Sequence, residues 1–124
     1  MAKPRALIVD DDEPIRVMLA AVVKQHGFVV ETARDGHEAI EKIDKGTFDV
    51  ILLDLMMPHV NGYDVLQHIR KKQPDLLRRT IVATAVPERE LKRDLTVPVF
   101  KVHMKPFDVP QLMADIQSAV KERT

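Results

Sequence analysis

The sequence predicts an α/β fold in which five parallel strands form a doubly wound sheet, in the order 2-1-3-4-5, with five helices. Short apolar runs alternate with segments whose apolar residues recur at helical spacing along the 124-residue chain. Strands and helices that alternate in this way form right-handed crossovers, which give a parallel sheet with helices on both faces. Acidic residues follow directly after the first and third runs, at the strand ends where such sheets bind ligands.

The predicted elements are bounded by residues that favour the ends of strands and helices. The strands are expected in apolar runs at residues 6–9, 28–33, 50–53, 81–83 and 99–104. Aspartate favours the position before a helix, whereas glycine and proline stop one. The helices are therefore expected between Asp12 and Gly27, Asp35 and Gly46, Asn61 and Pro74, Pro87 and Leu95, and from Asp108 to Val120. Residues 121–124 are expected to form a frayed helix end.

Composition limits both the architecture and the function. A chain of this length is predicted to form one domain, residues 1–124. It contains no cysteine, which excludes disulfides, thiolate catalysis and cysteine metal sites, and which fits a cytoplasmic protein. The 19 basic and 19 acidic residues balance, so we expect no direct binding to nucleic acid or to a membrane. The first apolar run is also too short for a signal peptide or a membrane span.

Polar residues gather at the predicted carboxyl ends of the central strands. Asp10 and Asp11 follow the first strand, and Asp54 follows the third. Thr84 ends the fourth strand and Lys105 follows the fifth. The carboxyl ends of these strands meet at one edge of a doubly wound sheet, so the five side chains are expected to converge on one crevice.

The convergence of these side chains predicts a chemistry. Carboxylates that lie together repel one another unless a cation joins them, and oxygen ligands favour a hard divalent ion, here Mg²⁺ with Mn²⁺ as a substitute. The Thr84 hydroxyl and the Lys105 ammonium could hold phosphoryl oxygens, and Asp54 could act as a nucleophile and form an acyl phosphate. Each residue alone also fits an ordinary role as a cap, turn or surface charge. Their convergence favours the functional interpretation.

The residues around these strand ends form motifs in a fixed order. They are Leu7-Ile8-Val9-Asp10-Asp11, Leu52-Leu53-Asp54-Leu55-Met56-Met57-Pro58, Asn61-Gly62, Thr84-Ala85 and Lys105-Pro106-Phe107. This ordered set resembles the receiver domains of two-component response regulators over essentially the whole chain. The resemblance implies a flavodoxin-like fold and a signalling protein, not an enzyme, whose own chemistry is limited to self-phosphorylation from phosphodonors and slow self-dephosphorylation. A histidine kinase or a phosphotransfer protein is the implied donor.

The resemblance also implies roles in phosphorylation and metal binding. Asp54 would carry the phosphoryl group. Asp11, Asp54 and the main-chain carbonyl of Met56 would ligate Mg²⁺ directly, and Asp10 would contact it through water. Met56 has a second expected role, because it lies two positions after Asp54 as Val86 does after Thr84. Two apolar side chains there are predicted to shield the acyl phosphate and slow its hydrolysis.

A conformational switch is implied as well. Thr84 would turn towards the phosphoryl oxygens and Lys105 would pair with them, with the Lys105-Pro106 peptide in the cis form. The position three before Lys105 usually carries a tyrosine or phenylalanine in the family, but here it is Val102. The usual coupling between the switch threonine and an aromatic side chain is therefore not expected here, because Val102 has no ring. Phe100 shares the strand parity of Val102 and is expected on the same side of the sheet.

The fourth helix is the other departure from the family pattern. Pro87 and Pro98 enclose a short, highly charged segment, and isolated helices of this length are marginal. We expect this helix to be shortened, mobile or displaced. Because this face commonly carries the output of such domains, the contacts with a downstream protein are expected to be unusual.

Two other functions compete with the receiver interpretation. Asp10-x-Asp12 resembles the nucleophile motif of haloacid-dehalogenase-type phosphatases, but the chain ends before the larger core that those enzymes need. A phosphorylation-independent, receiver-like adaptor is the stronger alternative, because of the altered fourth helix. The sequence names no cognate kinase, target or pathway. It leaves open whether the receiver stands alone or belongs to a longer protein, and whether it is a monomer or a phosphorylation-dependent dimer.

Overall fold

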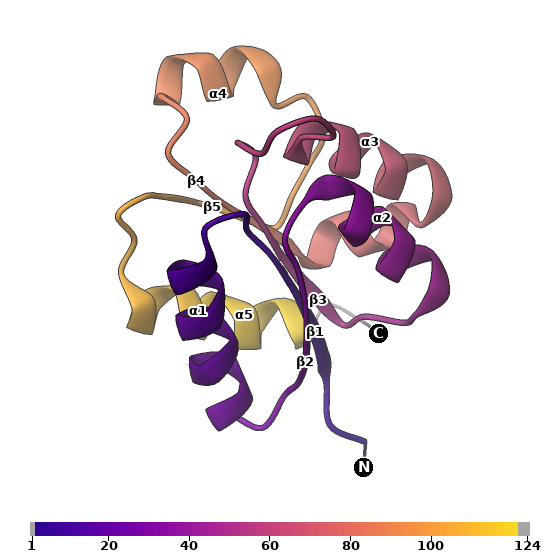
Figure 1. Cartoon of the computed structure of the whole chain (residues 1–124), viewed down its shortest axis with the longest axis vertical. Coiled ribbons are helices and arrows are strands. Elements are labelled where there is room, and N and C mark those ends of the chain that lie inside the picture. The colour runs from indigo at the N-terminus through magenta and orange to yellow at the C-terminus, as the bar shows by residue number, and fades with distance from the viewer. Residues whose placement is uncertain (1, 122–124) are drawn as a thin grey trace.

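A computed structural model describes residues 2–121 and shows one parallel sheet of five strands (Figure 1). The order along the sheet is β2-β1-β3-β4-β5, as the sequence predicts. All four neighbouring pairs are parallel. The strands are Arg5–Val9 (β1), Val29–Ala33 (β2), Val50–Leu53 (β3), Thr80–Thr84 (β4) and Lys101–Met104 (β5).

The five predicted helices are present, with one further turn of 3-10 helix. They are Glu13–Gln25 (α1), Gly36–Lys45 (α2), Gly62–Lys72 (α3), Glu88–Asp94 (α4) and Val109–Val120 (α5). The 3-10 helix, Pro74–Arg79 (η1), was not predicted and joins α3 to β4. The frayed end expected at residues 121–124 falls almost wholly outside the described residues.

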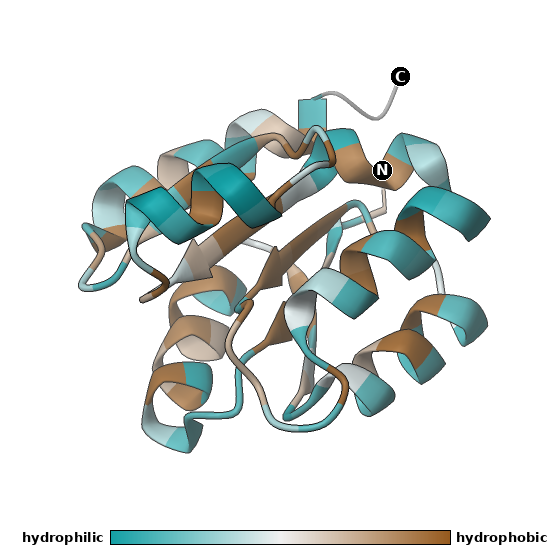
Figure 2. Cartoon of the chain, turned by 90° about the horizontal axis from the view of Figure 1, so that it is seen from above, coloured by the Kyte–Doolittle hydropathy of each residue, from teal (hydrophilic) through white to brown (hydrophobic). Residues whose placement is uncertain are grey.

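The helices cover both faces of the sheet. In Figure 1, α1 and α5 lie on one side of the strands and α2 and α3 on the other. The strands are brown through the centre of Figure 2, whereas the helices carry teal on their outer sides. Buried side chains alternate between the two faces along β1, β3 and β4. The α2–α3 side receives Leu7, Val9, Ile51, Leu53 and Val82, and the α1–α5 side receives Ala6, Ile8, Val50, Leu52 and Ile81.

Side-chain caps fix where most helices begin. Asp12, Asp35 and Asp108 each accept a hydrogen bond from the third backbone N–H after them, at 3.1, 2.8 and 3.0 Å. Asn61 and Asp64 form a capping box, in which each side chain accepts a hydrogen bond from the backbone N–H of the other residue. Such caps satisfy backbone donors that a helix leaves free at its first turn. They hold the loops that follow the strands and therefore support the edge of the sheet that carries the predicted site.

The α4 helix is the exception. It has only seven residues, the N-cap residue Pro87 makes no side-chain hydrogen bond to it, and Leu91 is its buried residue. Figure 1 shows it standing above the other helices at one end of the molecule. The predicted shortening is confirmed, whereas the predicted mobility stays a prediction.

The β5 strand is shorter and less covered than expected. It begins at Lys101 rather than at residue 99, and Val102 and Met104 are 37% and 39% exposed. Val102 pairs with Val82, whose side chain packs on the α2–α3 side. Phe100 packs instead with the α1–α5 cluster, so the expectation that it shares a side with Val102 was wrong. Phe100 precedes the regular strand, where alternation no longer fixes the direction of a side chain. Within residues 2–121, no helix has the length and apolar character needed to cross a membrane.

Candidate functional site

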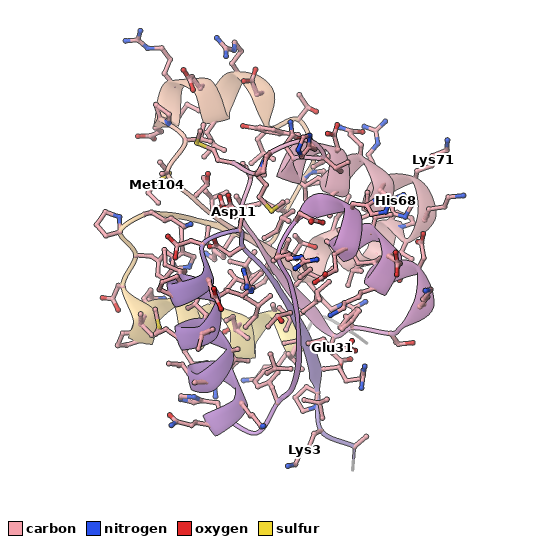
Figure 3. All side chains as sticks on the ribbon, in the orientation of Figure 1. Lys3, Asp11, Glu31, His68, Lys71 and Met104 are labelled. Carbon is pink, nitrogen blue, oxygen red and sulfur yellow. The ribbon has the colours of Figure 1, made fainter. Side chains whose placement is uncertain are left out.

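The predicted site residues do converge at the carboxyl edge of the sheet. Asp54 follows β3, and its backbone N–H donates to the Val9 carbonyl at the end of β1, at 3.0 Å. Lys105 follows β5, and its N–H donates to the carbonyl of Thr84 at the end of β4, at 2.8 Å. Figure 3 shows Asp11 and Met104 in the same part of the molecule, with Lys3 at the opposite end.

Three carboxylates form the centre of the site. One oxygen from each of Asp10, Asp11 and Asp54 lies within 4.8 Å of the others. Asp10 and Asp54 are 2% and 5% exposed, whereas Asp11 is open to solvent. Mg²⁺ is a hard cation that binds carboxylate oxygens and usually keeps several of its waters. Two buried carboxylates and one exposed carboxylate could bind such an ion on one side and leave its other side to water. The residues present therefore fit the metal that the sequence predicts.

Lys105 neutralises part of this charge. Its Nζ donates to Oδ2 of Asp10 at 2.9 Å and to Oδ2 of Asp54 at 3.1 Å. Burial of the Lys105 amine disfavours its charge, but hydrogen bonds and charges of the two aspartates outweigh this effect and raise its pKa. The amine therefore remains protonated and bridges the two buried carboxylates.

The environment of Asp54 disfavours the charged form of its carboxyl. Burial raises the pKa of its carboxyl above the ordinary value of 3.8, and the nearby charge of Asp10 adds to the rise. A hydrogen bond of 3.1 Å from the Met56 N–H to Oδ1 and the charge of Lys105 lower the same pKa. The effect of burial is the largest, so the pKa of Asp54 is raised. The ionised carboxylate is therefore destabilised in the site, and a nearby cation would offset this destabilisation.

Thr84 and the two predicted shielding residues lie beside this centre. Thr84 is fully buried, and its Oγ1 accepts a hydrogen bond of 3.2 Å from the Val86 N–H. Val86 is buried, whereas Met56 is 57% exposed. Both line a cavity of about 480 Å³ that also reaches Tyr63 on α3. The two apolar side chains thus share one cavity, formed in part by the loop that follows Asp54, and their shielding of an acyl phosphate stays a prediction.

Three contributors to the site were missed from the sequence. Arg16 on α1 donates from Nη1 to the Asp10 carbonyl at 2.9 Å and so holds the loop after β1. Gly62 lies so close to the loop after β3 that an added Cβ would lie 2.5 Å from the Asp54 carbonyl oxygen. A larger cavity of about 710 Å³ opens beside Asp11 and is lined in part by Arg16 and His59. Only Gly62 gave a sequence signal, as part of the Asn61-Gly62 motif, but no contact with the loop after β3 was predicted for it.

The family model for the response regulator receiver domain matches residues 6–117. The chain belongs to this family. Receiver domains accept phosphoryl groups from histidine kinases in two-component signalling, and they are signalling modules rather than classical enzymes. The phosphatase alternative is therefore excluded. The acidic pocket formed by Asp10, Asp11 and Asp54, together with Lys105, is consistent with phosphoryl acceptance by this receiver.

Curated relatives resemble the receiver over nearly its whole length. A probable transcriptional regulator of Guillardia theta, ycf27, is 36% identical over 123 residues, which cover 96% of this chain and 46% of the relative. The response regulator MprA of Mycolicibacterium vanbaalenii is 32% identical over 121 residues, covering 97% of this chain and 52% of the relative. The chain thus spans about half the length of the curated relatives that it matches.

Solved receiver structures share the fold. A CheY-like receiver domain protein from Methanospirillum hungatei has a TM-score of 0.89 at 27% identity, covering 98% of this chain and 96% of that one. The response regulator TrrA from Thermotoga maritima, solved in complex with Mg²⁺-BeF, has a TM-score of 0.83 at 31% identity. That match covers 94% of this chain and 98% of TrrA. The flavodoxin-like fold and the cis Lys105-Pro106 peptide, both expected from the resemblance, are confirmed.

Proposed function

We propose that this receiver accepts a phosphoryl group on Asp54 from a histidine kinase or a phosphotransfer protein, with Mg²⁺ bound beside it. The observation that carries the proposal is the set of three carboxylates within 4.8 Å, two of them bridged by the Lys105 amine. Asp11, Asp54 and the Met56 carbonyl would hold the metal directly, and Asp10 would hold it through water. The Mg²⁺-BeF complex of TrrA supports the choice of metal. Mn²⁺ could replace it.

In the proposed reaction a carboxylate oxygen of Asp54 attacks the phosphorus of the donor. A P–O bond forms while the P–N bond of the donor phosphohistidine breaks, and the imidazole nitrogen leaves with the electron pair. When bound, the metal neutralises charge on the phosphoryl oxygens. Lys105 already lies 3.1 Å from the Asp54 carboxylate and would transfer its hydrogen bond to a phosphoryl oxygen.

The proposed switch begins at Thr84. Its hydroxyl oxygen now accepts a hydrogen bond from the Val86 N–H. After phosphorylation, Thr84 would donate its own proton to a phosphoryl oxygen, and the loop between β4 and α4 would follow it. Val102 offers no ring that could rotate into the space left behind, so α4 itself is the element that responds. We propose that the receiver signals through altered protein contacts of this face, in the cytoplasm.

One observation favours a second function. The α4 helix is short and uncapped, and the neighbouring strand β5 exposes Val102 and Met104. A receiver-like adaptor that binds its target through this face without phosphorylation would show the same features. The two functions differ in whether modification of Asp54 changes the affinity for the target.

Intact mass after incubation with acetyl phosphate tests the proposal. We expect one phosphoryl adduct with Mg²⁺ and none without the metal, because the crowded carboxylates need a cation before a phosphoryl dianion can approach. Asp54→Asn should abolish the adduct. Asp35→Asn is a matched control, because Asp35 caps α2 and asparagine also caps well. An adduct that survives Asp54→Asn would contradict the proposal, and the complete absence of an adduct would favour the adaptor.

A further inference from the structure

A partly buried pair of polar side chains lies between the end of β5 and α5 and has no part in the proposed reaction. His103 on β5 places Nε2 2.7 Å from Oδ2 of Asp115 on α5. The two side chains are only 12% and 15% exposed. The other oxygen of Asp115 accepts a hydrogen bond of 3.3 Å from the Gln111 side chain, one turn earlier on α5. Polar groups that are largely removed from solvent usually have such hydrogen-bond partners.

The hydrogen bond between His103 and Asp115 closes a loop that contains Lys105. Residues 103–115 run from the end of β5 through the cis Lys105-Pro106 peptide into the first turns of α5. Inside this segment, the Asp108 side chain fixes the start of α5 by accepting a hydrogen bond from the Gln111 N–H. The strand end and the helix are thus tied on either side of Lys105.

The β5 strand has few other restraints. It is an edge strand of four residues that pairs with β4 alone, and three of these residues are exposed to solvent. Its last backbone hydrogen bond is the one from the Lys105 N–H to the Thr84 carbonyl. His103 lies opposite Ala83, whose small side chain leaves room for the imidazole between the sheet and α5. The contact with Asp115 therefore holds a strand that has no neighbour on its outer side.

We propose that His103 and Asp115 are positioning residues that keep the Lys105 amine between Asp10 and Asp54. This inference rests on the proposed function, because it assigns the placement of Lys105 to phosphoryl acceptance. Neither residue touches the phosphoryl group. When the contact is lost, the amine spends less time beside the two carboxylates. Phosphorylation then slows, and Mg²⁺ binds more tightly because less positive charge competes with it.

The chain offers a matched control in a second histidine–aspartate pair. His68 on α3 lies 2.7 Å from Asp44 on α2, with side chains 20% and 48% exposed. Figure 3 shows His68 on the side of the molecule away from Asp11 and Met104. The comparison is therefore His103→Leu against His68→Leu. His103→Gln keeps a donor for Asp115 and serves as the rescue variant, and it also covers the case in which the leucine variant does not fold.

The first measurement is hydrogen exchange of the metal-free protein, read at the Lys105 N–H. Local opening of β5 exposes this group without unfolding the core. In His103→Leu we expect the Lys105 N–H to exchange about tenfold faster, because a tenfold change needs the loss of only about 1.4 kcal/mol of local stability. The slowest core amides report global stability, and the rate at Lys105 is corrected for any change in them. His68→Leu and His103→Gln should leave the corrected rate at Lys105 unchanged.

The second measurement is the affinity for Mg²⁺, followed by the rate of phosphorylation from acetyl phosphate. In His103→Leu we expect the dissociation constant for Mg²⁺ to fall about threefold and the rate of phosphorylation to fall about tenfold. Displacing the positively charged Lys105 amine by a few ångströms changes the electrostatic energy at the metal site by an amount that corresponds to such factors. Equal effects of His103→Leu and His68→Leu on exchange and Mg²⁺ affinity would overturn the inference. If the unaltered protein takes no phosphoryl group while exchange and Mg²⁺ affinity respond as expected, the proposed function fails and the positioning role is supported.

Discussion

At the scale of single residues, the site depends on how buried charges are matched. Asp10 and Asp54 are both buried, and Lys105 bridges them, so that a cluster that would otherwise repel itself carries one compensating charge inside the fold. Asp11 stays open to solvent, and in the proposed function it would add a ligand where a hydrated cation can enter. These residues were predicted from the sequence because each directly follows, or lies one position beyond, the end of a strand.

Tyr63 differs from these site residues, because its buried hydroxyl oxygen has no hydrogen-bond partner among the described residues. Its hydroxyl is the one buried side-chain N or O atom in the described part of the chain that has no hydrogen-bond partner. Burial raises the pKa of Tyr63 above 10.0, and Asp94 and Glu90 raise it further. We predict that Tyr63→Phe increases the free energy of unfolding by about 1 kcal/mol at neutral pH, because an unsatisfied buried hydroxyl is removed. Urea unfolding measures the change, and a clear loss of stability would count against it.

The raised pKa of Tyr63 has a consequence at high pH. The folded protein holds the phenolic proton more tightly than the unfolded chain, so this contribution to stability is complete below pH 10.0 and is lost as the pH rises through the folded pKa. Tyr63→Phe should lack this loss. The chain has one tyrosine and no tryptophan, so the absorbance of tyrosinate reports Tyr63 alone. A midpoint at or below pH 10.0 would contradict the account.

Met56 and Val86 are predicted to slow the hydrolysis of the acyl phosphate on Asp54 by shielding it from water. Both are apolar and line the cavity of about 480 Å³ that the loop after Asp54 helps to form, and neither side chain can hydrogen-bond a water molecule strongly enough to orient it. We predict that Met56→Asn with Val86→Thr speeds the decay of the phosphorylated receiver about tenfold, within the range that a positioned polar group contributes. Val17→Thr, an equivalent change at a valine that is 58% exposed on α1, is the control. The decay of the intact-mass adduct gives the rate, and an unchanged rate in the double variant would refute the shielding role.

At the scale of elements, the two helices that flank the smaller cavity differ in how they are held. The α3 helix begins with a capping box and buries four residues. The α4 helix has no side-chain cap and buries Leu91 alone. Helices of this length obtain most of their stability from packing, so α4 is the element most easily displaced.

Hydrogen exchange distinguishes the two helices directly. We predict that amides of residues 91–94 on α4 exchange at least about tenfold faster than those of residues 66–72 on α3, because their opening breaks fewer buried contacts. The comparison is made within one sample, so differences in global stability cancel. Equal protection of the two segments would show that α4 is firmly docked.

The elements that the sequence predicted less well depend on contacts between distant residues. Pro74 was interpreted only as the end of α3, but the chain continues into η1, where Leu76 and Leu77 are buried. The Thr80 hydroxyl donates to the Leu76 carbonyl at 2.8 Å and helps to hold this turn. The start of β5 was misplaced for a similar reason, since Phe100 is drawn towards the α1–α5 cluster rather than along the strand. Local patterns of apolar residues do not contain this information.

At the scale of the whole molecule, the topology was predictable because few arrangements satisfy alternating strands and helices. Right-handed crossovers predicted the parallel sheet, the doubly wound arrangement supplied the strand order that is observed, and the strand ends then located the site. The sequence did not predict hydrogen bonds between residues that only the folded chain brings together. Arg16 with the Asp10 carbonyl, and His103 with Asp115, join elements without any motif in the sequence.

The central claim is that Asp54 is the residue that carries the phosphoryl group. Borohydride reduces an acyl phosphate to an alcohol, so treatment of the phosphorylated protein should convert the modified aspartate into homoserine. Peptide mass spectrometry then reads the position. We predict homoserine at position 54 alone, and only after incubation with both phosphodonor and Mg²⁺. Homoserine at position 10 or 11, or a phosphoryl group that survives on a histidine, would contradict it.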